Sequence, residues 1–326
     1  MARMRAGTGQ RRQLQGSLFE PLEARVLLHQ YFWAGGDGDW NDPAKWNVLA
    51  GPPPAPTPTP LPGGNDIVTI ADAAATVTIP AGFGAQALTA NIASSLRILA
   101  NGSLNITGSN LSTSGTITLD GGGLTEMRFT AGNASITGAG TIQFANGGGS
   151  VGLTSSLGTL LLGSNLTVRS GTSGGVISAG IIESRATIIA EGANPSGIFI
   201  RPNKQFANRG TMQINGSAIR LGTGSGDTWS NFGQINLAGG LLSLGGNYRQ
   251  ADLGRFSRTG GTLEATGRLL GNLTLDAQTG SWIGGGTLVG GRLVTLQGAT
   301  FNAAGSTFED YTLGSDLTVL GGFNVR

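Results

Sequence analysis

The sequence predicts an all-β protein, a right-handed parallel β-helix in which short strands wind into stacked coils. Three observations lead to this prediction. Gly accounts for 58 of the 326 residues, about 18% against an average of about 7%. Short runs of alternating apolar and polar residues recur from residue 65 onward. Several of these runs repeat at a spacing of 23–25 residues, which is typical of solenoid proteins.

Composition excludes several other classes. The glycines lack the three-residue period of collagen, and there is no Cys to build a disulfide scaffold. The net charge is only +2 and aliphatic residues are frequent, so the chain is not predicted to be disordered. No apolar stretch approaches the length of a membrane-spanning helix, so we do not expect an integral membrane protein. Gly costs about 1 kcal/mol relative to Ala inside a helix, which disfavours a helical fold.

The alternating runs are short and are separated by Gly, Asn, Ser or Asp. Such alternation with a period of two places apolar side chains on one side of a strand. Gly and Asn between the runs suit corners where the backbone takes positive φ. Examples are Ile67–Ile70, Ala75–Ile79, Thr116–Leu119 and Asn165–Val168.

The spacing of matching segments indicates one coil of about three strands per repeat. Residues 65–326 would then form about eleven coils, and a spacing of about 4.8 Å gives a rod about 50 Å long. The segments that match are Gly115-Thr116-Ile117 with Gly140-Thr141-Ile142, Asn208-Arg209-Gly210 with Asn231-Phe232-Gly233, Gly260-Gly261-Thr262-Leu263 with Gly285-Gly286-Thr287-Leu288, and Leu162–Val168 with Leu313–Val319.

Residues 1–30 form a leader whose composition differs from the rest of the chain. Arg outnumbers Glu by five to two in residues 1–28, whereas acidic side chains outnumber basic ones by 16 to 15 in the rest of the chain. A surface that follows nucleic acid phosphates needs clustered Lys and Arg, so we expect no nucleic acid partner. Glu20, Glu23 and Arg25 interrupt the apolar core that a secretory signal peptide requires. The leader therefore leaves the route of export open.

Within the leader, Leu22-Glu23-Ala24-Arg25-Val26-Leu27-Leu28 resembles the LEPR-XLL motif found near the N-terminus of large surface proteins of Planctomycetes and related bacteria. Ala24 stands where that motif has Pro. The resemblance covers about ten residues and implies export to the cell surface, without implying any chemistry. A short amphipathic helix is the alternative interpretation of the same residues.

Residues 31–64 are expected to cap the first coil. Three of the five Trp of the chain lie here, at Trp33, Trp40 and Trp46. The pattern resembles the opening segment of autotransporter-like β-helical surface proteins. Independently of that resemblance, the first coil of a solenoid exposes apolar side chains and free strand edges, which clustered Trp side chains can cover. The Pro-rich residues 51–62 are predicted to be an extended loop inserted into the cap.

Two functional interpretations of this segment remain open beside the cap. The aromatic residues could form a platform for sugar rings, and Asp37, Asp39, Asn41 and Asp42 could provide alternate oxygen ligands for a weak calcium site. Val48 stands where an EF-hand loop has its Glu, and Asp and Asn also favour turns for local reasons. The cap interpretation is therefore the preferred one.

Catalytic, metal-binding and cofactor-binding residues are not expected. His29 is the only His, and a Cys-based nucleophile or soft-metal site is impossible without Cys. The carboxylates of the body are scattered, with Glu309-Asp310 the only adjacent pair. Glu183 lies close to Arg185 on one strand, and Glu191 would meet Arg169 if the coils stack suitably. Both combinations are interpreted as solvated ion pairs.

These observations favour a non-enzymatic, exported β-solenoid, a structural or adhesin-like component of the cell surface or extracellular space. Its partners would be extracellular polysaccharide or other surface proteins. The alternative is a carbohydrate-active β-helix enzyme, a polysaccharide lyase or glycoside hydrolase, which would need carboxylates converging in a cleft. No cap is recognisable in Leu320–Arg326, so we expect either a longer natural chain or end-to-end self-association.

Overall fold

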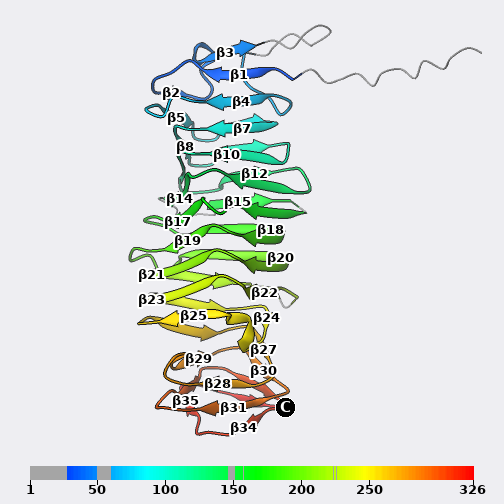
Figure 1. Cartoon of the computed structure of the whole chain (residues 1–326), viewed down its shortest axis with the longest axis vertical. Helices are drawn as coiled ribbons and strands as arrows, with labels where there is room; N and C mark the ends of the chain where they lie inside the picture. The colour runs from blue at the N-terminus through cyan, green and yellow to red at the C-terminus, as the bar shows by residue number, and fades with distance from the viewer. Residues whose placement is uncertain (1–27, 50–59, 146–150, 157, 223, 225) are drawn as a thin grey trace, which may run out of the picture.

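The computed structural model is an all-β rod, a parallel β-solenoid of about eleven coils (Figure 1). It describes residues 28–49, 60–145, 151–156, 158–222, 224 and 226–326. Two short 3-10 helices, η1 (Pro43–Lys45) and η2 (Gln250–Leu253), are the only helices in these ranges. The predicted fold class is confirmed, with the coil number expected from the repeat length. The leader with its LEPR-XLL-like motif lies outside the described residues, except for its end from Leu28 onward.

Each coil after the first contributes one strand segment to each of three faces, which we call the first, second and third faces in chain order. The pairs between successive coils are parallel throughout. The first face contains β1 (Gln30–Trp33), β4 (Ile67–Ile70), β7 (Thr89–Ile92), β10 (Asn110–Thr113), β13 (Ala134–Thr137), β16 (Thr159–Leu162), the second halves of β18 (Gly175–Ser184) and β20 (Ile198–Asn208), β22 (Thr228–Asn231), β24 (Asn247–Tyr248), β27 (Arg268–Leu270), β30 (Thr287–Val289), β33 (Thr307–Glu309) and β36 (Asn324–Val325).

The other two faces are built in the same way from the remaining strands. The second face contains β2 (Gly38–Asp39), β5 (Thr76–Ile79), β8 (Ser95–Leu99), β11 (Thr116–Asp120), β14 (Thr141–Ala145), β17 (Thr167–Ser170), β19 (Thr187–Ala190), the first halves of β21 (Thr211–Leu221) and β23 (Gln234–Leu244), β25 (Arg255–Arg258), β28 (Leu273–Leu275), β31 (Arg292–Thr295) and β34 (Thr312–Leu313). The third face contains β6 (Gly84–Ala87), β9 (Ser103–Ile106), β12 (Thr125–Phe129), β15 (Val151–Ser155), the first halves of β18 and β20, the second halves of β21 and β23, β26 (Thr262–Ala265), β29 (Trp282–Gly284), β32 (Phe301–Ala303) and β35 (Thr318–Val319).

The interior of the rod is a continuous column of apolar side chains. Most strands bury every second residue, as the alternating sequence pattern predicts. On the first face, for example, Val68, Ala90 and Leu111 lie in register on successive coils and are all buried. Burying a side chain as large as Val68 or Leu111 contributes roughly 1.5–3 kcal/mol. Each coil therefore gains stability by stacking on its neighbours.

Two of the sequence matches reproduce the strand register. Ile117 pairs with Ile142, and Asn208 pairs with Asn231. The match between Gly260–Leu263 and Gly285–Leu288 wrongly predicts that these two segments stack on each other. Thr287 lies beside Arg268 on the first face, whereas Thr262 belongs to the third face. The coils become shorter after β25, so the repeat spacing found in the sequence connects two different faces there.

The Trp-rich segment caps the first coil. Strand β3 (Trp46–Leu49) runs antiparallel to β1 and covers the edge that β1 turns away from β4. The ring of Trp46 packs edge-on against Trp33 and Trp40, both at 5.0 Å between ring centroids, and its indole N–H donates to the carbonyl of Trp40 at 2.8 Å. Tyr31 is fully buried in the same cluster. Aromatic rings packed this way bury large apolar areas, as a cap requires.

The second face is interrupted between β25 and β28, two described strands that no backbone ladder joins. Two side chains replace the ladder. Gln250 accepts from the backbone N–H of Thr274 at 2.8 Å and donates to its carbonyl at 2.5 Å, as a neighbouring strand would. Arg258 donates to four backbone carbonyls, those of Gly260, Gly261, Thr279 and Ser281. Desolvation lowers the pKa of this half-buried guanidinium.

Candidate functional site

The carboxylates on the outer faces are mostly held by an Arg or by a backbone amide. The predicted contact between Glu191 and Arg169 is confirmed, with Arg169 Nε 2.6 Å from Glu191 Oε1. Glu183 is also paired as predicted, at 3.0 Å from Arg185, and it has a second partner in Arg209 at 3.4 Å. The remaining pairs are Arg97 with Asp120, Arg128 with Glu126, and Arg268 with Glu309.

Two acidic residues of the cap, Asp37 and Asp42, accept hydrogen bonds from backbone amides. Asp37 accepts from the backbone N–H of Thr76 at 2.7 Å, and Asp42 caps η1 by accepting from Ala44 at 2.9 Å. Asp39 lies exposed in β2. Among the described residues, no three His, Asp or Glu side chains form a set that could hold a metal ion. The contacts made by Asp37 and Asp42 agree with the cap interpretation.

The three Trp of the cap do not form an open platform for sugar rings. Trp40 is fully buried, and Trp33 and Trp46 are 7% and 6% exposed. A sugar ring stacks on an aromatic face that solvent can reach, and these faces are covered by one another. The sugar-platform interpretation of these residues is therefore wrong. The sequence left it open because Trp residues that cluster for burial and Trp residues that cluster for sugar binding give the same pattern.

One buried pair lies across the predicted leader boundary. His29 belongs to the predicted leader, yet it lies inside the rod next to β1 and is only 6% exposed. Its Nδ1 is 3.3 Å from Asp66 Oδ1, and its carbonyl accepts from the backbone N–H of Ile67. A second oxygen of Asp66 accepts from the N–H of Gly63 at 2.7 Å. The pair joins the first two coils, a structural task that a lone His in sequence does not indicate.

A concave surface lies at the corner between the third and first faces. Gly occupies this corner in five successive coils, in three of them because backbone segments stack closely there, and at Gly222 and Gly305 with positive φ. A Cβ on Gly245, Gly267 or Gly286 would lie 2.0–2.2 Å from a carbonyl oxygen of the preceding coil. Without side chains the corner forms a groove of about 650 Å³, which we call the corner groove.

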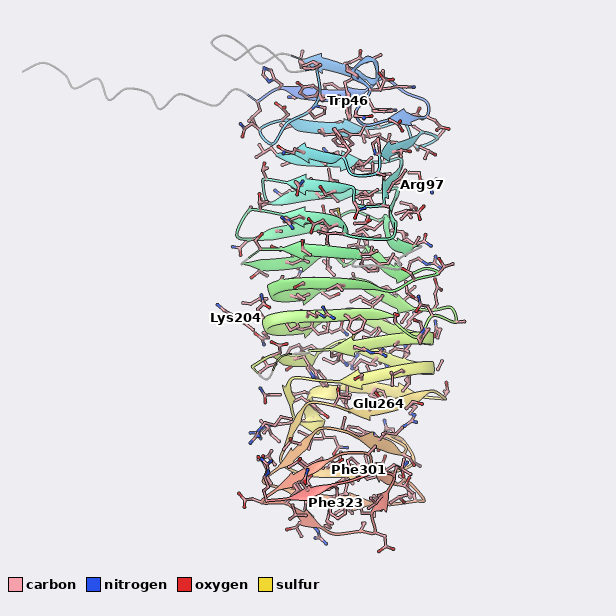
Figure 2. All side chains as sticks on the ribbon, turned by 180° about the vertical axis from the view of Figure 1, so that it is seen from behind. Trp46, Arg97, Lys204, Glu264, Phe301 and Phe323 are labelled. Atoms are coloured by element: carbon pink, nitrogen blue, oxygen red, sulfur yellow. The ribbon has the colours of Figure 1, made fainter. Side chains whose placement is uncertain are left out.

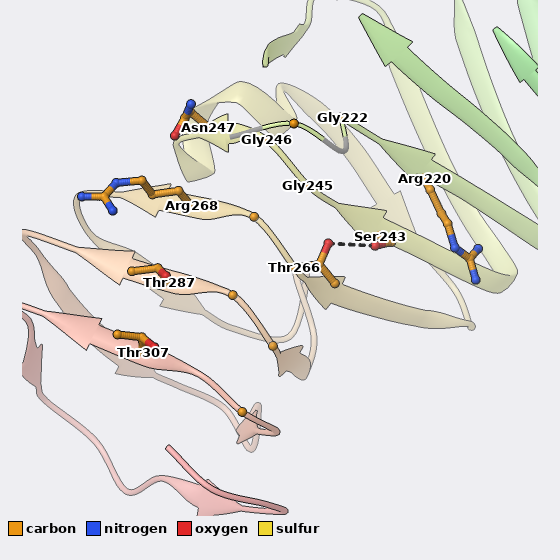
Figure 3. A pocket seen from close by; sticks show the side chains of 15 residues that line it. Arg220, Gly222, Ser243, Gly245, Gly246, Asn247, Thr266, Arg268, Thr287 and Thr307 are labelled. Carbon is orange, nitrogen blue, oxygen red and sulfur yellow. Dashed lines mark hydrogen bonds between the residues drawn. The ribbon is translucent and has the colours of Figure 1, made fainter. Parts of the chain in front are cut away.

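The walls of the corner groove carry hydroxyl, amide and guanidinium groups (Figure 3). On the side of the third face, the hydroxyls of Ser243 and Thr266 are 3.0 Å apart, and Arg220 lies beyond them. On the side of the first face, Asn247, Arg268, Thr287 and Thr307 follow one another in register along the rod. Arg268 is neutralised by Glu309 at 2.9 Å, whereas Arg220 makes no ion pair with any described residue.

Arg220 also belongs to an aromatic cluster on the third face. Phe199 lies beside it on the preceding coil, and the guanidinium carbons of Arg201 and Arg220 lie 4.8 and 5.3 Å from the ring centroid of Phe199. Such cation–π contacts contribute roughly 0.5–1 kcal/mol each at exposed sites. We call these three residues the arginine–phenylalanine cluster. The sequence pattern does not indicate it, because its residues come from two coils.

Comparison with protein families, with curated proteins and with solved structures finds no match to this chain. In the part of the chain that the structure describes, no helix is both long enough and apolar enough to cross a membrane. The site must therefore be interpreted from its own geometry. That geometry consists of a groove lined by hydroxyl groups, with Arg220, which makes no ion pair among the described residues, on one side and Arg268, paired with Glu309, on the other.

Proposed function

We propose that this chain is a non-enzymatic β-solenoid that serves as a structural or adhesin-like component of the cell surface. The proposal rests on the observation that most carboxylates of the body are already held by a partner in the protein. Of the thirteen in residues 65–326, ten have a partner that holds them in place: Asp66, Asp72, Asp120, Glu126, Glu183, Glu191, Asp227, Asp252, Asp276 and Glu309.

Acid–base hydrolysis of a glycosidic bond needs two carboxylates facing each other across the substrate. Glu264, Asp310 and Asp316 are the body carboxylates without such a partner among the described residues, and only Glu264 lies on a strand of the third face, in β26. None of the three lines the corner groove. A polysaccharide lyase or glycoside hydrolase would need other groups to converge there. Carboxylates engaged in structural contacts suit a rigid rod whose outer faces serve as a binding surface.

The resemblance of Leu22–Leu28 to the LEPR-XLL motif supports placement at the cell surface. Stacked coils whose outer positions carry Thr, Ser and Asn give a rod with a polar, weakly charged surface. Such a surface can contact polysaccharide or other surface proteins along its length.

Localisation in the native host tests the proposal directly. Intact cells are treated with a protease that cannot enter them, and the solenoid is then detected with an antibody raised against residues 65–326. We expect the protease to cleave the solenoid, so that the antibody detects fragments in the medium or a shortened chain on the cell. A cytoplasmic control protein should stay uncleaved. Recovery of the solenoid only in the cytoplasmic fraction would contradict the proposal.

A further inference from the structure

The charge of the solenoid is segregated along the rod, although its total is close to neutral. Residues 65–198 hold four basic and six acidic residues, and residues 259–326 hold three basic and five acidic residues. Between them, residues 199–258 hold only Asp227 and Asp252 as acids. The seven basic residues of this middle band are Arg201, Lys204, Arg209, Arg220, Arg249, Arg255 and Arg258. Lys204 projects from the side of the rod (Figure 2).

Within this band, Arg201 and Arg220 place two positive charges on one face. They flank Phe199 from two sides, and no described carboxylate lies within ion-pair distance of either one. Two like charges that share one ring repel each other. Six other arginines of the rod are held by a carboxylate, namely Arg97, Arg128, Arg169, Arg185, Arg209 and Arg268, whereas Arg201 and Arg220 share a single aromatic ring instead. An anion supplied from outside would relieve this repulsion and form charge-assisted hydrogen bonds.

We propose that the arginine–phenylalanine cluster and the adjoining corner groove bind an anionic polysaccharide, a chain of uronic acid sugars lying along the rod. Arg220 joins the two parts, since it packs on Phe199 and also lines the groove. The carboxylates of the sugar chain would meet Arg201 and Arg220, and its hydroxyls would meet Thr266, Thr287 and the other polar groups of the walls. The inference rests on the proposed function, because it names the partner of a surface protein.

The chemistry of the site favours a sugar polymer over single-stranded nucleic acid. Bases bind by stacking on open aromatic faces, whereas the ring of Phe199 is flanked by two guanidinium groups. The groove walls offer hydroxyl and amide groups repeated at the spacing of the coils, about 4.8 Å. A pyranose ring is about as long as that spacing, so successive sugars can meet equivalent groups on successive coils.

The test measures binding of polygalacturonate to the full chain at two salt concentrations. The Arg201→Gln/Arg220→Gln double variant removes the charges, and Gly285→Leu fills the groove. Gly285 accepts a Cβ without strain, because the nearest non-neighbouring atom would be 3.6 Å away and its φ is ordinary. The matched controls are Arg255→Gln, an exposed arginine of the same band on the second face, and Gly122→Leu, where a Cβ meets no atom within 4 Å.

We expect the double variant and Gly285→Leu each to bind polygalacturonate at least about tenfold more weakly, with a shallower salt dependence for the double variant. Both controls should stay within about twofold of the parent. Circular dichroism of every variant verifies folding. The inference is wrong if the parent does not bind, if Arg255→Gln weakens binding as much as the double variant, or if single-stranded DNA binds as tightly with the same arginine dependence.

The same samples separate this inference from the proposed function. After prolonged incubation, the chain length of the polygalacturonate is measured by size-exclusion chromatography. Binding without shortening supports both proposals. Binding with shortening supports the inference and contradicts the non-enzymatic function. Absence of binding overturns the inference, while the localisation experiment still decides the proposed function.

Discussion

Two tyrosine hydroxyls in the C-terminal third of the chain differ in whether they find a hydrogen-bond partner. Tyr311 donates to the carbonyl of Gly271 at 3.0 Å, whereas the hydroxyl of Tyr248 is buried with no partner among the described residues. We expect Tyr311→Phe to lower the free energy of unfolding by about 1 kcal/mol, because it removes a net favourable hydrogen bond. Tyr248→Phe should be neutral or stabilising by about 1 kcal/mol, since it removes an unsatisfied group and keeps the stack on Trp229.

The same residues predict how stability changes at alkaline pH. Burial raises the pKa of Tyr311 to about 12 and raises that of Tyr248 still further, from the ordinary value of 10.0. A raised folded-state pKa contributes stability that is complete below the unfolded pKa and is lost as the pH rises through the folded value. Chemical denaturation between pH 9 and about pH 12 should therefore show a smaller loss in either variant than in the parent. An identical loss in all three proteins would contradict the assignment.

Asn231 is the most heavily bonded buried amide at the corner between the first and second faces. It accepts from Asn208 at 2.6 Å and donates to the carbonyls of Leu253 at 2.7 Å and Arg255 at 3.1 Å. We expect Asn231→Ala to cost about 2–3 kcal/mol, because several buried polar groups lose their partner together. Asn215, an exposed residue of β21, is the matched control, and its change to Ala should stay within about 0.5 kcal/mol. Equal losses in both variants would rule out these hydrogen bonds as the cause.

At the scale of elements, the interruption of the second face makes a prediction about local opening. Among the described residues, Gln250 supplies the only strand-like contact between Thr274 and the preceding coil on that face. We expect Gln250→Ala to increase amide hydrogen exchange in β28 at least about tenfold, because the N–H of Thr274 loses its acceptor and the coil opens more often. Exchange in β8 and β11, several coils away, should not change. Gln278→Ala, at an exposed neighbouring turn, serves as the control, and comparable exchange in that variant would disprove the role of Gln250.

The strand elements could be predicted from the sequence, while their register could be predicted only where the spacing of two matching segments equals the length of the coil between them. Gly115-Thr116-Ile117 and Gly140-Thr141-Ile142 stack as expected, because Thr116 pairs with Thr141 and the coil between them is as long as the spacing of the two segments. Gly285–Leu288 does not stack on Gly260–Leu263, because the coils are shorter there and Thr287 pairs with Arg268 instead. The same difficulty hides the arginine–phenylalanine cluster. Arg220 pairs with Phe199 at a step shorter than the repeat seen in the sequence, and that repeat would place a different residue beside the ring.

At the scale of the whole molecule, each coil touches only its neighbours, so stability is expected to vary along the rod. The cap at β1 and β3 is the clearest place to test this. Trp46 contacts Tyr31, Trp33 and Trp40 and is 6% exposed. Its removal uncovers the apolar end of the first coil and leaves a cavity, with a cost of about 3–5 kcal/mol for a buried Trp.

We therefore expect Trp46→Ala to act locally. Hydrogen exchange measured by mass spectrometry should rise in β4, β5 and β7, which follow the cap, and should remain at the parent level in β30 and β33, at the other end. Phe32→Ala, on the outer side of β1 and 37% exposed, is the matched control and should change exchange little. A uniform rise along the rod in Trp46→Ala would mean that all coils unfold as one cooperative unit. A rise limited to the first coils would mean that the aromatic cap protects one end of a nearest-neighbour stack, because each later coil still rests on an intact one.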